Sequence, residues 1–188
     1  QADFQSGTLT NVVATAAGDL ELANNPALSF DGVDDYAQIA ANGFGKFNIQ
    51  SFTIEAWVYV GALANYIIVW SYDYTSHVEP YYAQHLRIES GGAVFLGFNI
   101  AGVFKKLVTA SGAITAGAWN HVAAVFTSGK QEIYVNGALK ASSGETGSVT
   151  YYNQPVWVGR ANFGYTKACI LDEIRIWNRA RTQAEIQA

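Results

Sequence analysis

The chain has 188 residues, of which half are hydrophobic and only 14% are charged, and its formal net charge is −4 at pH 7. This length suits one large domain, residues 1–188, whose core needs no disulfide bonds. The negative charge argues against a nucleic-acid partner, and no apolar run reaches about 18 residues, so we expect no membrane insertion. The chain lacks Met and begins at Gln1, which we interpret as a domain excised from a larger extracellular protein.

Alternation of apolar and polar residues predicts β-strands along much of the chain. In the clearest case, residues 51–60, one face carries every second residue from Phe52 to Val60, and Glu55 and Trp57 lie on the other. Residues 119–127 and 156–159 also have the character of strands. Asn136-Gly137 lies between two apolar runs and predicts a hairpin with a type I′ turn.

Helix signals are nearly absent. The exception is Thr182-Gln-Ala-Glu185, which fits a capping box at the start of a short helix near the end of the chain. Many short strands, frequent turns and one terminal helix predict an all-β fold, a sandwich of two packed antiparallel sheets.

Four stretches, in this order, resemble the laminin G-like branch of the concanavalin A-like lectin/glucanase superfamily. They are residues 27–36, 52–58, 119–125 with 133–137, and 171–180 with 185–186. The resemblance spans residues 27–186 and implies an antiparallel jelly-roll β-sandwich with one concave and one convex sheet. Because the superfamily includes lectins, carbohydrate-binding modules, glucanases and adhesion modules, function must be argued from the sites.

The residues also predict a structural calcium site around Asp172. Regular alternation would place Asp172 in an apolar row with Ile170, Ile174 and Ile176, where a carboxylate needs a cation or hydrogen-bond donors. The further candidate ligands for Ca²⁺ are Asp31, Asp34 and Asp19. By the resemblance, Asp172 matches an Asp that, in related glucanases, joins carbonyl groups of an early loop around calcium. The alternatives are an Asp172 paired with Arg or backbone N–H groups, and plain turn chemistry for Asp31 and Asp34.

The motifs of the superfamily's enzymes are missing. No Glu starts the Glu-x-Asp-x-x-Glu pattern of the glucanases, which supplies two carboxylates for glycoside hydrolysis. Arg87-Ile-Glu89 lacks the second Arg of the related lyases, and Gln84-His85 lacks their Gln-x-His spacing. We therefore expect no catalytic activity.

Aromatic residues are unusually frequent: eleven Tyr, ten Phe and five Trp. Flat amphipathic rings stack on the apolar faces of sugars, while hydroxyl, amide and guanidinium groups bond the sugar hydroxyls. The predicted carbohydrate-binding residues gather in a Tyr-rich stretch and in two later segments: Tyr72, Tyr74, Tyr81, Tyr82, His85, Arg87, Tyr151, Tyr152 and Tyr165. The competing interpretation is packing, because aromatic residues are enriched in strands. For the five Trp residues and for Cys169 we favour a core position.

Two functions remain at this level. The first is a non-catalytic, carbohydrate-binding, lectin-like module of a secreted or cell-surface protein, with a structural Ca²⁺ and a glycan or polysaccharide as its partner. The alternative is an adhesion or spacer domain that contacts other extracellular proteins. An exposed row of aromatic residues bordered by polar groups in a groove would favour the first.

Overall fold

The computed structural model describes the backbone of residues 2–3, 7–8, 12–14, 20–22, 27–39, 50–72, 82–150 and 155–188, and the side chains of 27–38, 50–71, 84–150 and 155–188. Five of the residues predicted to bind calcium or carbohydrate lie outside the described residues: Asp19, Tyr74, Tyr81, Tyr151 and Tyr152. For Tyr72 and Tyr82 only the backbone is described.

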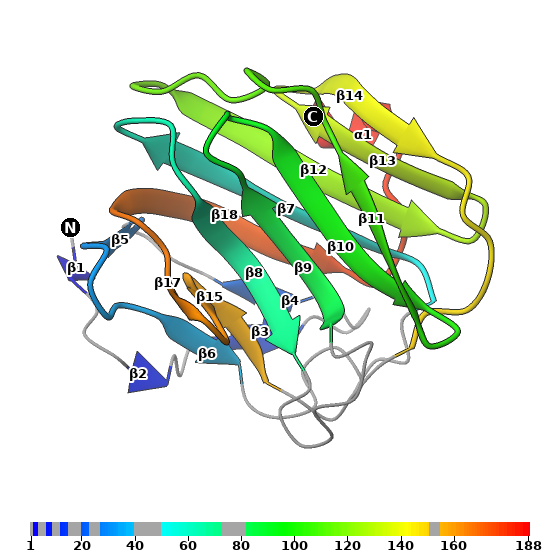
Figure 1. Cartoon of the computed structure of the whole chain (residues 1–188), viewed down its shortest axis with the longest axis horizontal. Coiled ribbons are helices and arrows are strands. Elements are labelled where there is room, and N and C mark those ends of the chain that lie inside the picture. Colours follow the sequence, from blue (N-terminus) through cyan, green and yellow to red (C-terminus); the bar gives the residue numbers. More distant parts are fainter. Residues whose placement is uncertain are drawn as a thin grey trace.

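Two largely antiparallel β-sheets pack face to face in the described part of the chain (Figure 1). In order, the nine-stranded sheet contains β1 (Ala2–Asp3), β5 (Leu28–Phe30), β18 (Cys169–Trp177), β7 (Phe52–Val60), β12 (Trp119–Thr127), β13 (Lys130–Val135) and β14 (Ala138–Ser143), with β4 (Leu20–Leu22) beside β18 and β3 (Val12–Ala14) beside β4. The seven-stranded sheet contains β11 (Val103–Val108), β10 (Val94–Ile100), β9 (Tyr82–Ile88), β8 (Tyr66–Tyr72), β15 (Val156–Val158), β6 (Ala37–Ile39) and β2 (Gly7–Thr8). A small hairpin joins β16 (Arg160–Ala161) to β17 (Gly164–Tyr165), and the chain ends after helix α1 (Gln183–Ile186).

The predicted all-β sandwich is confirmed, and its core lies between the two sheets. On β7 the residues Phe52, Ile54, Ala56, Val58 and Val60 are all fully buried, as the alternation predicts. They pack in one apolar cluster with residues of both sheets. The face of β7 that carries Trp57 is therefore the outer face of the nine-stranded sheet.

The predicted local signals are also confirmed. Asn136 and Gly137 take positive φ values of 51° and 73° in the turn between β13 and β14. Thr182 and Glu185 form a reciprocal capping box on α1.

The described part of the chain contains no helix with the length and apolarity needed to cross a membrane.

The predicted faces of β18 are wrong in its first half, and a β-bulge is the reason. The pairing with β7 shifts between Asp172 and Arg175, and Glu173 has a positive φ of 50°. The extra residue interrupts the period of two. Leu171 and Ile174 therefore both face the core, while Asp172 lies on the outer face and is partly exposed, so no buried charge forces it to bind a cation.

Candidate functional site

Two exposed tryptophans stand on the outer face of the nine-stranded sheet. Trp57 of β7 pairs with His121 of β12, and Trp119 of β12 pairs with Tyr59 of β7. The two indoles are therefore diagonal neighbours on one face of adjacent strands. Trp57 is 40% exposed and Trp119 43% exposed, although the sequence favours a core position for both. This part of the sheet presents an aromatic surface to solvent.

The C-terminal segment covers the neighbouring part of the same face. Ile186 of α1 packs in an apolar cluster with Ala123, Val125 and Tyr134. Thr53 on β7 holds the segment before α1, because its hydroxyl donates to the carbonyl of Arg179 at 3.0 Å and accepts from the backbone N–H of Arg181 at 2.9 Å. The outer face of the sheet is thus closed on one side of the tryptophans and open beside them.

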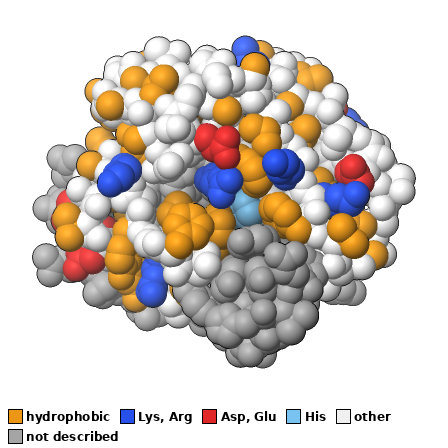
Figure 2. All heavy atoms as spheres, in the orientation of Figure 1, with side chains coloured by type: hydrophobic (Ala, Val, Ile, Leu, Met, Phe, Trp, Pro, Cys, Tyr) orange, Lys and Arg blue, Asp and Glu red, His pale blue; other side chains and the backbone are white. Residues whose placement is uncertain are grey.

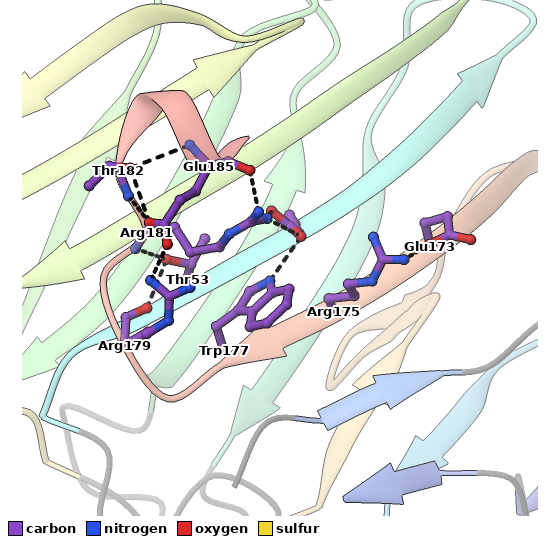
Figure 3. Close-up of polar contacts among 9 residues, drawn as sticks. Thr53, Glu173, Arg175, Trp177, Arg179, Arg181, Thr182 and Glu185 are labelled. Atoms are coloured by element: carbon purple, nitrogen blue, oxygen red, sulfur yellow. Dashed lines mark hydrogen bonds and ion pairs between the residues drawn. The ribbon is translucent and has the colours of Figure 1, made fainter. Parts of the chain in front are cut away.

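A buried ion pair fixes the C-terminal segment, residues 179–186, which forms a wall along one side of the two tryptophans. Glu55 is only 1% exposed although it lies on the outer face of β7. One terminal nitrogen of Arg181, Nη1, donates to both carboxylate oxygens of Glu55 at 2.7 and 2.6 Å, and the indole of Trp177 donates to the same carboxylate at 2.8 Å. Figure 3 shows Arg181 reaching from the C-terminal segment over β7, with Trp177 beside it. The guanidinium lies 4.6 Å from the centre of the Trp177 ring.

Between the wall and the tryptophans lies a groove with a cavity volume of about 620 Å³. Its lining mixes ring surfaces with polar groups: Glu55, Trp57, Trp119, His121, Asn136, Gly137, Arg175, Arg181, Glu185, Ile186, Gln187 and Ala188. Burial lowers the pKa of His121, Arg181 and Arg175 lower it further, and Glu55 opposes them. His121 therefore stays neutral at neutral pH and offers one hydrogen-bond donor and one acceptor.

A smaller chamber opens beside the groove. It has a volume of about 330 Å³, and its walls are Trp57, Trp119, Asp172 and Glu173. The bulge in β18 creates this arrangement, because Asp172 pairs with Trp57 in the ladder and its carboxylate accepts the backbone N–H of Glu173 at 2.8 Å. Glu173 forms an ion pair with Arg175, and Figure 3 shows the two side chains directed toward each other.

This arrangement is suited to binding. Both oxygens of Glu55 already accept hydrogen bonds from Arg181, and the carboxylate is shielded from solvent. Its role is therefore to hold the C-terminal wall in place. A general acid or base would have to reach a reacting group within hydrogen-bond distance. The groove offers instead two indole faces with donors and acceptors around them, which is the composition of a small-molecule site.

Those predicted carbohydrate-binding residues whose side chains the structure describes lie on the opposite side of the sandwich. Figure 2 shows the outer face of the seven-stranded sheet, with hydrophobic, basic and acidic side chains gathered over it. His85 is 1% exposed and stacks on Trp70 with 4.1 Å between ring centres, so it packs beneath this face rather than projecting from it. Burial lowers the pKa of His85 well below its usual value, and Arg87 adds to the effect. Arg87 is partly exposed and lies 4.0 Å from the centre of the Phe95 ring.

Tyr165 belongs to the same face. The residue is 38% exposed, and its ring lies 5.5 Å from the guanidinium of Arg160, which also sits over Tyr36 and Trp157. Trp157 pairs with Trp70 across β15 and β8. The structure therefore brings His85, Arg87 and Tyr165 to one side of the molecule.

The predicted metal residues are brought together only in part. Asp31 and Asp34 lie with Asp35 in the loop after β5, and one ligand oxygen from each carboxylate falls within 4.8 Å of the others. Asp172 is not part of this cluster. Asp35, which the sequence argument did not single out, is 5% exposed and accepts the backbone N–H of Asp31 at 2.8 Å.

The sequence argument missed the groove. A signal for it was present, because the alternation in residues 51–60 places Trp57 on the face opposite the core. The wall could not be foreseen, since it joins Glu55 to a residue 126 positions further along the chain.

Comparisons with known proteins agree with this fold. No curated protein sequence matches the chain. Among solved structures it is similar to the binding domain of botulinum neurotoxin DC in complex with SialylT (TM-score 0.62, 15% identity, 94% of this chain and 42% of that one). It is also similar to the heptameric SAP-like pentraxin of Limulus polyphemus (TM-score 0.56, 16% identity, 85% and 78%). A third similar structure is a Bacteroides ovatus protein assigned to carbohydrate binding (TM-score 0.59, 24% identity, 83% and 45%).

The chain spans less than half the length of the neurotoxin and Bacteroides structures. At these identities the likeness concerns the fold. A laminin G-type family model matches residues 31–187, most of the chain. The chain therefore belongs to the concanavalin A-like lectin/glucanases superfamily.

Proposed function

We propose that this domain is a non-catalytic, lectin-like module that binds a glycan outside the cell, in the groove over the nine-stranded sheet. The observation that carries the proposal is the pair of exposed indoles, Trp57 and Trp119, on adjacent strands of a rigid sheet. Two such rings stack on the apolar faces of sugar units at little cost in conformational entropy. His121, Asn136 and Arg175 line the same groove and supply hydrogen-bonding groups for sugar hydroxyls.

The similar structures support a binding role. Among them, botulinum neurotoxin type C depends for cell entry on interaction with two ganglioside molecules, and the Bacteroides ovatus protein is assigned to carbohydrate binding. Gangliosides carry sugars, and the part of that neurotoxin chain that is similar to this domain is 43% of its length. Placement outside the cell rests on the mostly uncharged polar surface that the composition predicts.

A glycan array followed by calorimetric titration tests the proposal. Trp57→Ala and Trp119→Ala should each lower the affinity for the best glycan by about tenfold or more, since a buried Trp contact is worth at least ~1.4 kcal/mol. Tyr165→Ala, in the β16–β17 hairpin on the opposite side of the sandwich, is the matched control, and it should bind as the parent does. If Tyr165→Ala abolishes binding and both Trp variants retain it, the surface over the seven-stranded sheet is the binding site. If the parent protein binds no glycan on the array, the proposal itself is contradicted.

We further propose that Asp31, Asp34 and Asp35 hold a structural Ca²⁺. Their oxygens lie close enough to share one hard cation, and backbone carbonyls or water would complete the six to eight oxygen ligands that it takes. A chelator should lower the melting temperature of the parent by several degrees, and Asp34→Asn should remove that shift. Asp172→Asn separates the two metal predictions, because it leaves the shift intact if the loop cluster alone binds the ion. No change with excess chelator at low residual metal contradicts the proposal.

A protein partner is the second candidate function, and two exposed apolar side chains favour it. Val33 is 71% exposed and Phe163 is 68% exposed. Phe163 lies edge-on against Trp70 with 5.3 Å between ring centres, and on the same face the Tyr36 and Tyr165 rings are 6.0 Å apart. One similar structure is the neurotoxin binding domain in complex with rat synaptotagmin II. The affinity of a partner that docks here should fall with Phe163→Ser and should not change with Trp57→Ala.

A further inference from the structure

The two exposed indoles belong to two separate aromatic pairs. Trp57 contacts the ring of His121 on the neighbouring strand, with 5.2 Å between ring centres and 59° between ring planes. Trp119 contacts Tyr59 in nearly the same way, at 5.8 Å and 57°. In the described part of the chain no ring contact joins Trp57 to Trp119, and diagonal neighbours on adjacent strands are about 7–8 Å apart. The outer face therefore carries two stacking platforms, each an indole braced by a ring of the other strand.

The two platforms are equivalent in the ladder of antiparallel strands. The pair Val58–Asn120 lies between them, where β7 and β12 run side by side in opposite directions. A half-turn about this pair carries Trp57 to the place of Trp119, and the ring that braces one indole to the place of the ring that braces the other. Two equal platforms accept two equal groups, so the arrangement suits a ligand whose units repeat.

Open space continues beyond both platforms. The chamber of about 330 Å³ extends from the indoles to residues 172–173 of β18. The groove of about 620 Å³ extends from the same indoles across β12 to the turn at residues 136–137, after β13. The strands follow one another in the sheet as β18, β7, β12 and β13, so chamber, Trp57, Trp119 and turn succeed one another across the strands. A chain of sugars stacked on both indoles therefore has room to continue at each end.

A ligand that joins two stacking contacts gains far more affinity than either contact gives alone. Once one unit is held, the second binds intramolecularly, and such a link raises affinity by about 10²–10⁴. Each indole is already held by its bracing ring, so little further ordering is needed when the chain binds. A single sugar unit uses one platform and gains nothing from the other.

We infer that this site binds an internal run of a linear glycan with repeating units, one unit on each indole, and not a single or terminal sugar. The inference rests on the proposed glycan-binding function and names the class of glycan that the site takes. The chamber and the groove then hold the units that precede and follow the stacked ones.

Calorimetric titration of the intact chain with oligosaccharides of increasing length tests the inference. The probes are β-1,4-linked oligomers of glucose, mannose, xylose and N-acetylglucosamine, each from one unit to six, together with six-unit chains reduced at the terminal aldehyde. In a series that binds, the affinity should rise about a hundredfold or more with length before it levels off. Reduction of the end unit should leave the affinity of the six-unit chain unchanged, because the stacked units are internal.

Removing one platform should affect long and short ligands differently. Trp57→Ala and Trp119→Ala should each weaken binding of the six-unit chain by about tenfold or more. Each should change the affinity for the monosaccharide only about twofold, because a single unit still has the other of two equal platforms. Tyr165→Ala, on the opposite side of the sandwich, is the matched control and should keep the full dependence on length.

An NMR titration with the six-unit chain reports on both platforms at once. The indole N–H signals of Trp57 and Trp119, assigned with the two variants, should shift together with one dissociation constant. The signal of Trp157 is the internal control and should not shift, because this indole donates to Gln38 at 2.9 Å in the other sheet.

The outcomes separate the inference from the proposed function. If one unit binds as tightly as six, or if only one of the two indole signals shifts, the groove binds a glycan but not a repeating run, and the inference is overturned. The same follows if reduction of the chain end abolishes binding, or if the glycan array yields only branched or terminal structures. If none of the series binds and the array is silent, the proposed function fails together with the inference.

Discussion

Replacing Glu55 by Gln should destabilise the protein far more than its place on the outer face of a sheet suggests. Glu55 is 1% exposed, and the Arg181 side chain that it holds is 15% exposed. Removing one partner of a buried ion pair costs about 3–5 kcal/mol, because the other charge is left buried and uncompensated. We expect the lower end, about 3 kcal/mol, since Arg181 keeps some contact with solvent and Gln still offers the Trp177 indole an acceptor.

Thermal unfolding gives the measurement. For a chain of this length each kcal/mol shifts Tm by about 2–4 °C, so Glu55→Gln should lower Tm by roughly 6–12 °C. The matched control is Glu89→Gln, whose pair with Arg87 has side chains 39% and 27% exposed and should be worth less than about 1 kcal/mol. The double variant Glu55→Gln/Arg181→Met should recover much of the loss. A Glu55→Gln protein that melts within about 2 °C of the parent would refute this account of the wall.

Three further predictions concern single positions. Gly97→Ala should cost about 1–3 kcal/mol in urea unfolding, because the new methyl group would collide with the ring of His85, which is held against Trp70; unchanged stability would mean that the ring can move. Burial raises the pKa of the Cys169 thiol to about 12, so a thiol reagent should label it in urea and leave it untouched in the native protein at neutral pH. Hydrogen bonds in the capping box, together with Arg179, lower the pKa of Glu185 to about 2. The contribution of ionised Glu185 to the stability of the fold is complete above pH 4.5, the pKa of the unfolded state, and is lost as the pH falls toward 2. The difference in Tm between the parent and Glu185→Gln should therefore shrink over that interval, and a constant difference would contradict it.

The sequence predicts those parts of the fold that depend on short-range patterns. The strand at residues 52–60 was placed correctly, with its buried face, because nothing interrupts its period of two. The turn at Asn136-Gly137 and the cap at Thr182 followed from the chemistry of adjacent residues. Each of these signals lies within one element of the chain.

The errors arose where distant segments meet or where the period breaks. The bulge at Glu173 leaves no mark in the amino-acid pattern, and one extra residue was enough to move Asp172 from a supposed core row to the outer face. Trp57 and Trp119 were assigned to the core because aromatic residues in strands usually pack. Their exposure depends on where the C-terminal segment lies, and that segment covers Glu55 while it leaves the two indoles open.

The insertion in β18 has a consequence for how the outer face of this scaffold can change. Leu171 and Ile174 keep their inward positions on either side of it, so the residue between the two halves of the strand belongs to neither pattern. Position 173 is therefore relieved of the packing demands that fix its neighbours, although it lines the chamber beside Trp57 and Trp119. Relatives that keep this backbone can exchange an acid for a neutral or basic residue there, and so change the charge of the outer face, without altering the interior of the sandwich.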